Sequence, residues 1–519
     1  MDMPPVETTE SNNSSMISTN ISMMDLMFDN RRYRVTPETP DIKQLATDLI
    51  HNYNLEEPFF VCDIGQIIKK HEAWNLYMPR VRPFYAVKCN DSPLVLETLA
   101  GLGTGFDCAS KVEMRKVLEI GVSPTDIIYA NPAKPRSHIV AAAEQGVQTV
   151  TFDSHVELLK MKRYLPGAKL VVRIRCEAER AQCPLGMKFG VNIEDATELL
   201  NAAKSLEMDV IGVSFHVGSG CMDPPVFYRA IAEARILFDY AARELGYDFS
   251  LLDIGGGFPG NTGTSIVEIA GVVNNALEDF FPQGCGVEVI AEPGRYYVAA
   301  AFTLVTQIHS IREIKSDDIT RYMYYINDGI YGSFNCIMYD HAIVRPEVIG
   351  IRQSDEVNLF ECSIWGPTCD GLDQVCSSEL LPKMEVGEWL VFPDMGAYTL
   401  VAGGTFNGFP LPKVHTVASA ITWNSLKDVM KTLAFVVDDV PVFPNSGVGY
   451  NRDAVGWGCV EEAVIGRVVS HFSNETEDGQ LINLASSATS DDESSISSSE
   501  SDEGQSSPTE EGVIEENNF

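Results

Sequence analysis

RPFYAVK, residues 82–88, is a short apolar run that ends on a lysine, and seven runs of the same kind follow it. They are TGFDCAS (104–110), DIIYAN (126–131), TVTFDS (149–154), KLVVRIR (169–175), VIGVSFHV (210–217), SLLDIGGG (250–257) and VEVIAEPG (287–294). Their length and their content of Val, Ile, Phe and Tyr are typical of buried strands. The segments between them have helical patterns, such as VEMRKVLEIG (112–121), whose last glycine suits a helix C-cap. Eight strands alternating with helices predict a (β/α)8 barrel; an open doubly wound sheet is the alternative.

The pattern changes near residue 300, where strands and turns replace the alternation. The runs AFTLVTQIHS (301–310), YMYYIND (322–328), EWLVFPDMGAYTL (388–400) and GRVVSHF (466–472) predict a second, mostly β domain. The earlier run EPFFVCDI (57–64) would be a ninth strand, so we expect it to pair with the β domain. We therefore divide the chain into a disordered tail (1–29), a segment that packs with the β domain (30–64), the barrel (65–300), the β domain (301–472) and a disordered acidic, Ser-rich tail (473–519).

The composition is strongly acidic, with a formal net charge of −35. No Lys or Arg follows Arg467, while 13 Asp and Glu lie between Glu475 and Glu516. Such a chain would repel nucleic-acid phosphates and anionic membranes, so we expect neither as a partner.

The cysteines and the N-terminus indicate a cytoplasmic protein. The 12 cysteines include no CxxC pair, which favours reduced thiols over a disulfide framework or a zinc site, and we expect no metal. The N-terminal MDMPPVETTE lacks the apolar core of a signal peptide, and no stretch approaches the roughly 18 apolar residues of a membrane span.

Polar residues follow nearly every predicted barrel strand, at the end where barrel enzymes carry their active sites. The main candidates are Lys88, Asp107, Arg173, His216 and Glu292. Because Lys88 follows the apolar run FYAV, we expect burial to lower its pKa and to favour the neutral amine that attacks aldehydes. A carboxylate such as Glu292 could keep a pyridine ring protonated, and His216 could stack on the ring. Taken alone, Lys88 could instead be a snorkelling lysine and His216 a core histidine.

The loop DIGGGFPG (253–260) matches the dinucleotide spacing GxGxxG, but Pro259 stands where the helix of that motif should already run. We interpret the loop as a phosphate site after the seventh strand, the usual phosphate position in these barrels. The residues that we assign to it are Gly255, Gly256, Gly257, Gly294, Arg295 and Ser219. A phosphate site opposite a lysine predicts pyridoxal 5'-phosphate as the cofactor.

Two segments of the β domain hold Asp, Cys, Trp and Tyr among glycines, GIYGSFNCIMYDH (329–341) and SIWGPTCDGLD (363–373). Asp340 and Asp370 are candidates for binding the cationic end of a substrate, and Cys369 could act as an acid or base. The wall residues predicted from these segments and from GAYTLVAGGTFNGF (396–409) are Tyr331, Tyr398 and Phe406.

Together these stretches resemble the eukaryotic ornithine decarboxylases, which are fold-type III (alanine-racemase-like) pyridoxal-phosphate enzymes. The resemblance extends over about residues 57–425 and is carried by PFYAVKCN, GTGFDCASK, IYANPAK, IGVSFHVGSGC, LLDIGGGFPG, IAEPGRYYVA, NDGIYGSFNC, WGPTCDGLD and MGAYTLVA. It implies a Schiff base at Lys88, a contact of Glu292 with the pyridine nitrogen and stacking by His216. It also implies cofactor contacts from Asp107, Arg173, Ser219, Gly255, Gly256, Gly257, Arg295 and Tyr398.

The resemblance implies decarboxylation of L-ornithine to putrescine and CO2, the first step of polyamine biosynthesis, by a head-to-tail homodimer. Cys369 and Asp370 would enter the site from the other subunit, and Asp340 and Asp370 would bind the δ-amine. A salt bridge between Lys188 and Asp373 would cross the interface.

Antizyme is a further partner that the resemblance implies, because residues 131–160 align with the family's antizyme-binding region. The alternatives are a decarboxylase that prefers lysine or arginine, a diaminopimelate-type enzyme, and a non-catalytic homologue that binds antizyme. Asp340 and Asp370 argue against a diaminopimelate site, which needs a basic group.

The C-terminal tail does not match the vertebrate degradation segment. Acidic residues three positions after Ser490, Ser497 and Ser499 predict phosphorylation there, with an unmodified, solubilising tail as the alternative.

Overall fold

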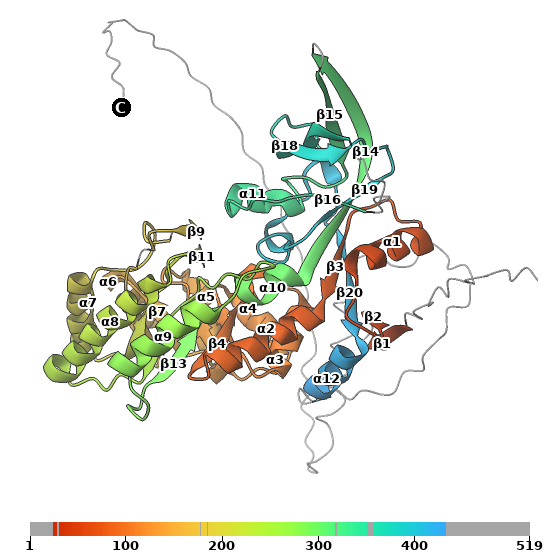
Figure 1. Ribbon diagram of the computed structural model, residues 1–519. Helices are drawn as coiled ribbons and strands as arrows, with labels where there is room; N and C mark the ends of the chain where they lie inside the picture. Colours follow the sequence, from red (N-terminus) through yellow and green to blue (C-terminus); the bar gives the residue numbers. More distant parts are fainter. Residues whose placement is uncertain are drawn as a thin grey trace, which may run out of the picture. The chain divides into compact units, whose positions relative to one another are not determined.

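The computed structural model describes residues 24–28, 31–176, 178–183, 185–316, 319–349 and 358–431 (Figure 1). The chain divides into two units, Met1–Ser446 and Gly447–Phe519, and all described residues belong to the first. The run GRVVSHF, the three candidate phosphorylation sites, the acidic tail and most of the N-terminal tail lie outside the described residues.

In the described ranges, all eight predicted runs form strands of one closed barrel, in the order β10-β12-β13-β4-β5-β6-β7-β8. The strands are β4 (Val81–Ala86), β5 (Gly105–Cys108), β6 (Ile127–Tyr129), β7 (Thr149–Phe152), β8 (Lys169–Arg173), β10 (Asp209–Ser214), β12 (Leu251–Asp253) and β13 (Glu288–Ala291). All neighbouring pairs are parallel. The barrel is therefore confirmed, and the open sheet is excluded.

Side chains fill the barrel interior in a cluster separate from the outer core. This inner cluster contains Phe84, Ile128, Ala130, Val171, Leu251 and Ile290. The barrel is thus a packed core, and chemistry is confined to the loops at the strand ends.

Helices connect and cover the barrel strands (Figure 1). They are α2 (Ile64–Tyr77), α3 (Pro93–Gly101), α4 (Lys111–Glu119), α5 (Arg136–Glu144), α6 (His155–Tyr164), α7 (Ile193–Ser205), α8 (Pro225–Tyr240) and α9 (Val267–Phe280), with the short α10 (Arg295–Val298) after β13. Local sequence sets the start of α4: Ser110 accepts a bond from the Glu113 N–H (3.2 Å), while Glu113 accepts one from the Ala109 N–H (2.6 Å). This reciprocal capping satisfies backbone donors that the helix itself cannot pair.

The β domain holds a sheet with ten strands in the described residues, in the order β1-β2-β20-β3-β14-β15-β17-β18, with β19 pairing β14 and β16. The strands are β1 (Met24–Phe28), β2 (Arg31–Thr36), β3 (Phe59–Asp63), β14 (Phe302–Ser316), β15 (Ile319–Ile326), β16 (Glu347–Val348), β17 (Leu359–Trp365), β18 (Gln374–Pro382), β19 (Trp389–Phe392) and β20 (Lys413–Ser419). The helices of this part are α1 (Ile42–Tyr53), α11 (Cys336–Tyr339) and α12 (Ala420–Lys431). The predicted pairing of EPFFVCDI is confirmed, since β3 lies between β14 and β20.

The β domain contacts the barrel at the carboxyl ends of the barrel strands. The Tyr398 N–H donates to the carbonyl oxygen of Cys89 (2.9 Å), and Nδ2 of Asn90 donates to that of Gly396 (2.9 Å). A small two-stranded antiparallel sheet of β9 (Ala181–Cys183) and β11 (Ser219–Cys221) lies on the same side. These contacts place residues 394–398 beside the loops that carry the predicted site.

Two further observations bear on the expectations from sequence. Every cysteine within the described ranges is a free thiol. None of the helices that the structure describes combines the length and apolar character needed to cross a membrane.

Candidate active site

Lys88 lies in a single helical turn, η1 (Val87–Cys89), directly after β4. Its Nζ donates a hydrogen bond to Oδ2 of Asp107. The two residues are neighbours because Ala86 on β4 is in register with Asp107 on β5. Asp107 is 1% exposed, so this ion pair is buried on its carboxylate side.

The expectation that burial lowers the pKa of Lys88 is wrong. Burial does act in that direction, but the charges of Asp107, Glu292 and Tyr398 together outweigh it and raise the pKa above the ordinary lysine value. Lys88 therefore holds its proton in this arrangement. It becomes a nucleophile only when that proton leaves Nζ.

Glu292 and Asp253 form a buried pair of carboxyl groups at the ends of β13 and β12. The Glu292 N–H donates to the Gly255 carbonyl oxygen (2.7 Å), and the Gly255 N–H donates to Oδ1 of Asp253 (2.9 Å). Burial raises the pKa of Glu292 well above its ordinary value, with Asp107 and Asp253 adding to the effect, and burial raises the pKa of Asp253 to about 6. Arg173, at the end of β8, is the nearby cation that opposes both shifts.

His216 lies in the loop after β10 with its imidazole neutral. Burial lowers its pKa well below the ordinary value, and the positive charges of Arg173 and Lys88 act in the same direction. Its Nδ1 accepts a hydrogen bond from the Gly218 N–H (3.0 Å), which assigns the ring hydrogen to Nε2. A Cβ on Gly256 would come within 2.7 Å of that Nε2, so the ring lies directly against the glycine loop.

The glycine loop approaches neighbouring backbone more closely than side chains allow. Gly255 has φ +62°, and a Cβ there would lie 1.9 Å from the carbonyl oxygen of Phe215. Only glycine accommodates both the conformation and the contact. Backbone N–H groups at the barrel mouth are thereby left uncovered by side chains, as an anion site requires.

Arg295 stands beside this loop and is held by three neighbours. Its Nε and Nη2 donate to Oγ of Ser219 (3.2 and 3.0 Å), and Nη2 also contacts both carboxylate oxygens of Asp340 at 2.6 Å. The guanidinium lies 5.3 Å from the centre of the Tyr398 ring. Within the described residues these contacts use Nε and Nη2 and leave Nη1 available for an anion.

Tyr331, Cys369, Asp370 and Phe406 form a separate group in the β domain. The Tyr331 hydroxyl donates to Oδ2 of Asp370, its ring lies 4.5 Å from that of Phe406, and the Cys369 N–H donates to Oδ1 of Asn407 (3.1 Å). Cys369 is exposed to solvent. The structure thus joins Asp340 to the Arg295 group, and Asp370 to this second group.

The predicted interface pair occupies two different environments. Lys188 is exposed, with Nζ 5.0 Å from the Phe189 ring centre. Asp373 is 1% exposed and accepts bonds from the Ile330 N–H (2.9 Å) and from the N–H (3.0 Å) and hydroxyl (2.6 Å) of Thr368. Its carboxylate therefore already joins two loops of its own chain.

These residues fit pyridoxal phosphate. Oδ1 of Asp107 is a buried acceptor without a hydrogen-bond partner among the described residues, beside the lysine that would bear the cofactor. Arg295, Ser219 and the glycine loop match a phosphate dianion, and Glu292 and His216 match a pyridine ring. Residues that could hold the group are thus present for each of its parts.

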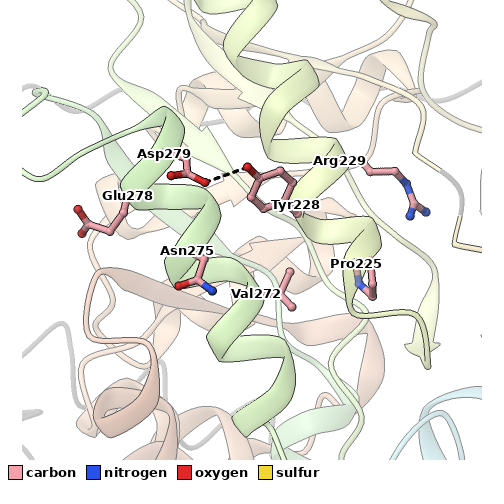
Figure 2. Close-up of a pocket in the computed structure, with 7 residues that line it drawn as sticks. All are labelled: Pro225, Tyr228, Arg229, Val272, Asn275, Glu278 and Asp279. Atoms are coloured by element: carbon pink, nitrogen blue, oxygen red, sulfur yellow. Dashed lines mark hydrogen bonds between the residues drawn. The ribbon is translucent and has the colours of Figure 1, made fainter.

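A hollow of about 580 Å³ lies away from these residues, on the outer face of α8 and α9 (Figure 2). Tyr228 donates from its hydroxyl to Oδ2 of Asp279 there (2.8 Å), and none of the predicted site residues lines it. Within the described residues no group of three or more His, Cys, Asp or Glu side chains could hold a metal ion. The barrel mouth is therefore the candidate site.

Two residues of this site were not predicted from the sequence, Asp253 and Gln182. Asp253 had a usable signal, because it stands directly before the three glycines at a strand end. Gln182, whose amide contacts Asp340, lies in a polar stretch of sequence without such a signal.

The fold and the site define a pyridoxal-phosphate enzyme of the barrel type. The family model described as "Pyridoxal-dependent decarboxylase, pyridoxal binding domain" matches residues 64–299. Ornithine decarboxylase of Rattus norvegicus is 50% identical over 401 residues, 75% of this chain and 87% of that protein, and antizyme inhibitor 2 of Xenopus laevis is 47% identical over 404 residues, 75% and 88%. The chain belongs to the pyridoxal-dependent decarboxylases, in the family of the ornithine decarboxylases.

Solved structures agree with this placement. The arginine decarboxylase of Paramecium bursaria Chlorella virus, crystallised with agmatine, superimposes with a TM-score of 0.69 at 35% identity, over 72% of this chain and all of that chain. A lysine/ornithine decarboxylase of Vibrio vulnificus, crystallised with putrescine, gives a TM-score of 0.65 at 30% identity, over 73% of this chain and 98% of that chain.

Proposed function

We propose that this chain converts L-ornithine to putrescine and CO2, with pyridoxal phosphate bound through Lys88. The observation that carries the proposal is the Lys88–Asp107 ion pair at the barrel mouth, on the side that holds Arg295 and the glycine loop. This arrangement offers an amine and a separate anion site to one cofactor.

When bound, pyridoxal phosphate supplies the electron sink for the electron pair of the broken Cα–carboxylate bond. The chain's own groups prepare that step. Asp107 accepts a hydrogen bond from the protonated Nζ of Lys88 and holds the amine in place, and Glu292 holds a proton at a carboxyl group buried at the barrel mouth. Neutral His216 would stack on the ring without adding a positive charge, and Arg295 and Ser219 would hold the phosphate. Cys369 is our candidate for the acid that returns a proton to Cα.

Ornithine is the substrate that the relatives favour. The curated ornithine decarboxylases reach 50% identity, whereas the solved arginine and lysine decarboxylases lie between 33 and 36%. Asp340 and Asp370 supply carboxylates for a cationic chain end, which all three substrates carry. The preference among them depends on chain length, and one methylene is worth only about 1–3 kcal/mol.

We also propose a homodimer whose subunits share their active sites. The β domain, which carries Cys369 and Asp370, also exposes large apolar side chains, including Tyr339 (75% exposed), Ile343 (87%) and Leu372 (69%). An exposed apolar group of this kind is typical of a protein–protein interface. Lys188 and Asp373 remain the predicted interface pair. In that pair Asp373 would also keep its hydrogen bonds to Ile330 and Thr368 of its own chain.

The second candidate is a non-catalytic homologue that binds antizyme, favoured by the 47% identity to antizyme inhibitor 2. The intact Lys88–Asp107 pair and the presence of Cys369 and Asp370 support an active enzyme instead. Antizyme as a partner is compatible with both readings. Exposed Arg136, Lys162 and Arg163 on α5 and α6 would suit an acidic partner surface.

We place the protein in the cytoplasm.

The test is kcat/KM for CO2 release from ornithine, lysine and arginine, measured with the absorbance of the lysine-bound cofactor. We expect the cofactor band, and the largest kcat/KM on ornithine. A cofactor band with a preference for lysine or arginine would correct the substrate alone. Absence of both the band and CO2 release would identify the non-catalytic homologue.

A further inference from the structure

Gln182 reaches across the barrel mouth to Asp340. It is the middle residue of β9, which pairs with β11 through the registers Ser219↔Cys183 and Cys221↔Ala181. Its Nε2 donates to Oδ2 of Asp340 at 3.0 Å and to the Asp340 carbonyl oxygen at 2.6 Å. One amide therefore holds both the side chain and the backbone of the same residue.

The two-stranded β9–β11 sheet leaves room for this side chain. Gly220 on β11 has φ +63°, and a Cβ there would lie 3.0 Å from Cβ of Gln182. The adjacent Cys183 adds a weaker contact from its Sγ to Oδ1 of Asp340 (3.4 Å). The two-stranded β9–β11 sheet, which belongs to the barrel, is thus joined to the end of α11 in the β domain.

Asp340 is buried, and its carboxylate is attracted toward Arg295. A second contact is therefore needed to fix its orientation. Asp340 is 5% exposed, and both of its carboxylate oxygens contact Arg295 at 2.6 Å. Gln182 is a neutral donor, so it fixes the carboxylate without adding a second positive charge to that of Arg295. A lysine or arginine in its place would put a second cation against the same carboxylate and would compete with a cationic substrate end.

We propose that Gln182 is a positioning residue that orients Asp340 and thereby sets the affinity for the distal amine of the substrate. The inference deepens the proposed function and rests on the role of Asp340 given there. Gln182 acts through Asp340 and not on the reacting atoms. Its loss should therefore weaken substrate binding more than it slows the chemical step.

The experiment compares Gln182→Ala, Gln182→Glu, Asp340→Asn and the double variant Gln182→Ala/Asp340→Asn in the holoenzyme. For Gln182→Ala we expect KM for ornithine and the inhibition constant of putrescine to rise about tenfold, the loss expected for one hydrogen bond to a charged group. We expect kcat to stay within about threefold. Gln182→Glu should be worse than Gln182→Ala, because it places a second carboxylate against Asp340.

The double variant shows whether Gln182 acts through Asp340. Its KM should not exceed that of Asp340→Asn, because the partner of the amide is already altered. The control is Arg180→Ala, two residues before Gln182. Within the described residues its exposed side chain donates only to the Met222 carbonyl oxygen (3.4 Å), so the substitution should leave KM unchanged.

Two results would overturn the inference. One is a Gln182→Ala enzyme with unchanged KM while Asp340→Asn raises it, since the substrate role of Asp340 would stand without Gln182. The other is additive effects in the double variant. If Asp340→Asn itself leaves KM for ornithine and putrescine inhibition unchanged, the failure lies in the proposed role of Asp340.

Discussion

Replacing Gly256 by alanine tests whether the glycine loop positions His216 and Glu292. A Cβ at this residue would lie 2.7 Å from Nε2 of His216 and 2.8 Å from the carbonyl oxygen of Glu292. Ordinary contacts to a Cβ begin at about 3.4 Å. The imidazole must therefore move by about 0.7 Å and the Glu292 backbone by about 0.6 Å, by subtraction from those distances.

Such a displacement should damage catalysis more than folding. A misplacement of about 1 Å in an active site can cost on the order of a hundredfold in rate, whereas overpacking costs about 1–3 kcal/mol of stability. We expect kcat/KM for ornithine to fall by about 30- to 100-fold, with a folded dimer and weaker cofactor binding. The assay is CO2 release together with thermal unfolding.

The matched control is Gly271→Ala in α9. No atom lies within 4 Å of a Cβ there, and the residue is exposed. Alanine is the better helix former, so this variant should keep full activity and gain up to about 1 kcal/mol. Gly256→Ala with activity within about threefold of wild type would refute the close contact on which the reasoning rests.

Three further predictions concern the subunit interface, pH and the tail. Mixing inactive Lys88→Ala and Cys369→Ala chains should restore partial activity, because mixed dimers regain one complete site; no recovery after verified subunit exchange contradicts shared sites. The pKa of Asp253 is raised from 3.8 to about 6 in the fold. The protonated carboxyl therefore contributes to the stability of the folded state, fully below pH 3.8, and this contribution is lost as the pH rises through about 6. Asp253→Asn should therefore favour the folded protein more at neutral pH than at about pH 5, seen in denaturant unfolding; an equal effect at both pH values would contradict the burial of that charge. Truncation after Phe472 should leave kcat/KM unchanged and alter cellular half-life, whereas a loss of activity or melting temperature would show that the domain boundary is misplaced.

The barrel could be predicted from the sequence because each strand run is short, apolar and followed by a polar residue. The pairing of β3 with the β domain followed from counting strands, since a ninth could not join a closed eight-stranded barrel. The alternation of apolar strand runs with helical segments along the chain is therefore enough to predict the barrel. Lys88, Asp107, His216 and Glu292 could be proposed because each follows such a run.

Contacts between distant segments could not be predicted in this way. The pKa of Lys88 depends on Asp107 on the neighbouring strand β5 and on Glu292 after β13, the strand that pairs with β4 on its other side. The apolar residues before Lys88 in the sequence predicted a lowered pKa, which is the wrong direction. The Arg295–Asp340 pair joins the barrel to the β domain, and sequence gave no sign that these opposite charges meet. Each case depends on tertiary geometry, which the sequence periodicity does not encode.

The attachment of the cofactor to Lys88 is the central claim, and reduction with borohydride followed by peptide mapping tests it most directly. We predict a pyridoxyl group on Lys88 alone in the wild-type enzyme. Ornithine added before reduction should protect Lys88, because the substrate amine displaces it. In Lys88→Ala, the cofactor absorbance band and nearly all CO2 release should be lost while the fold persists. A reducible linkage at another lysine, or full labelling of Lys88 in the presence of ornithine, would contradict the account.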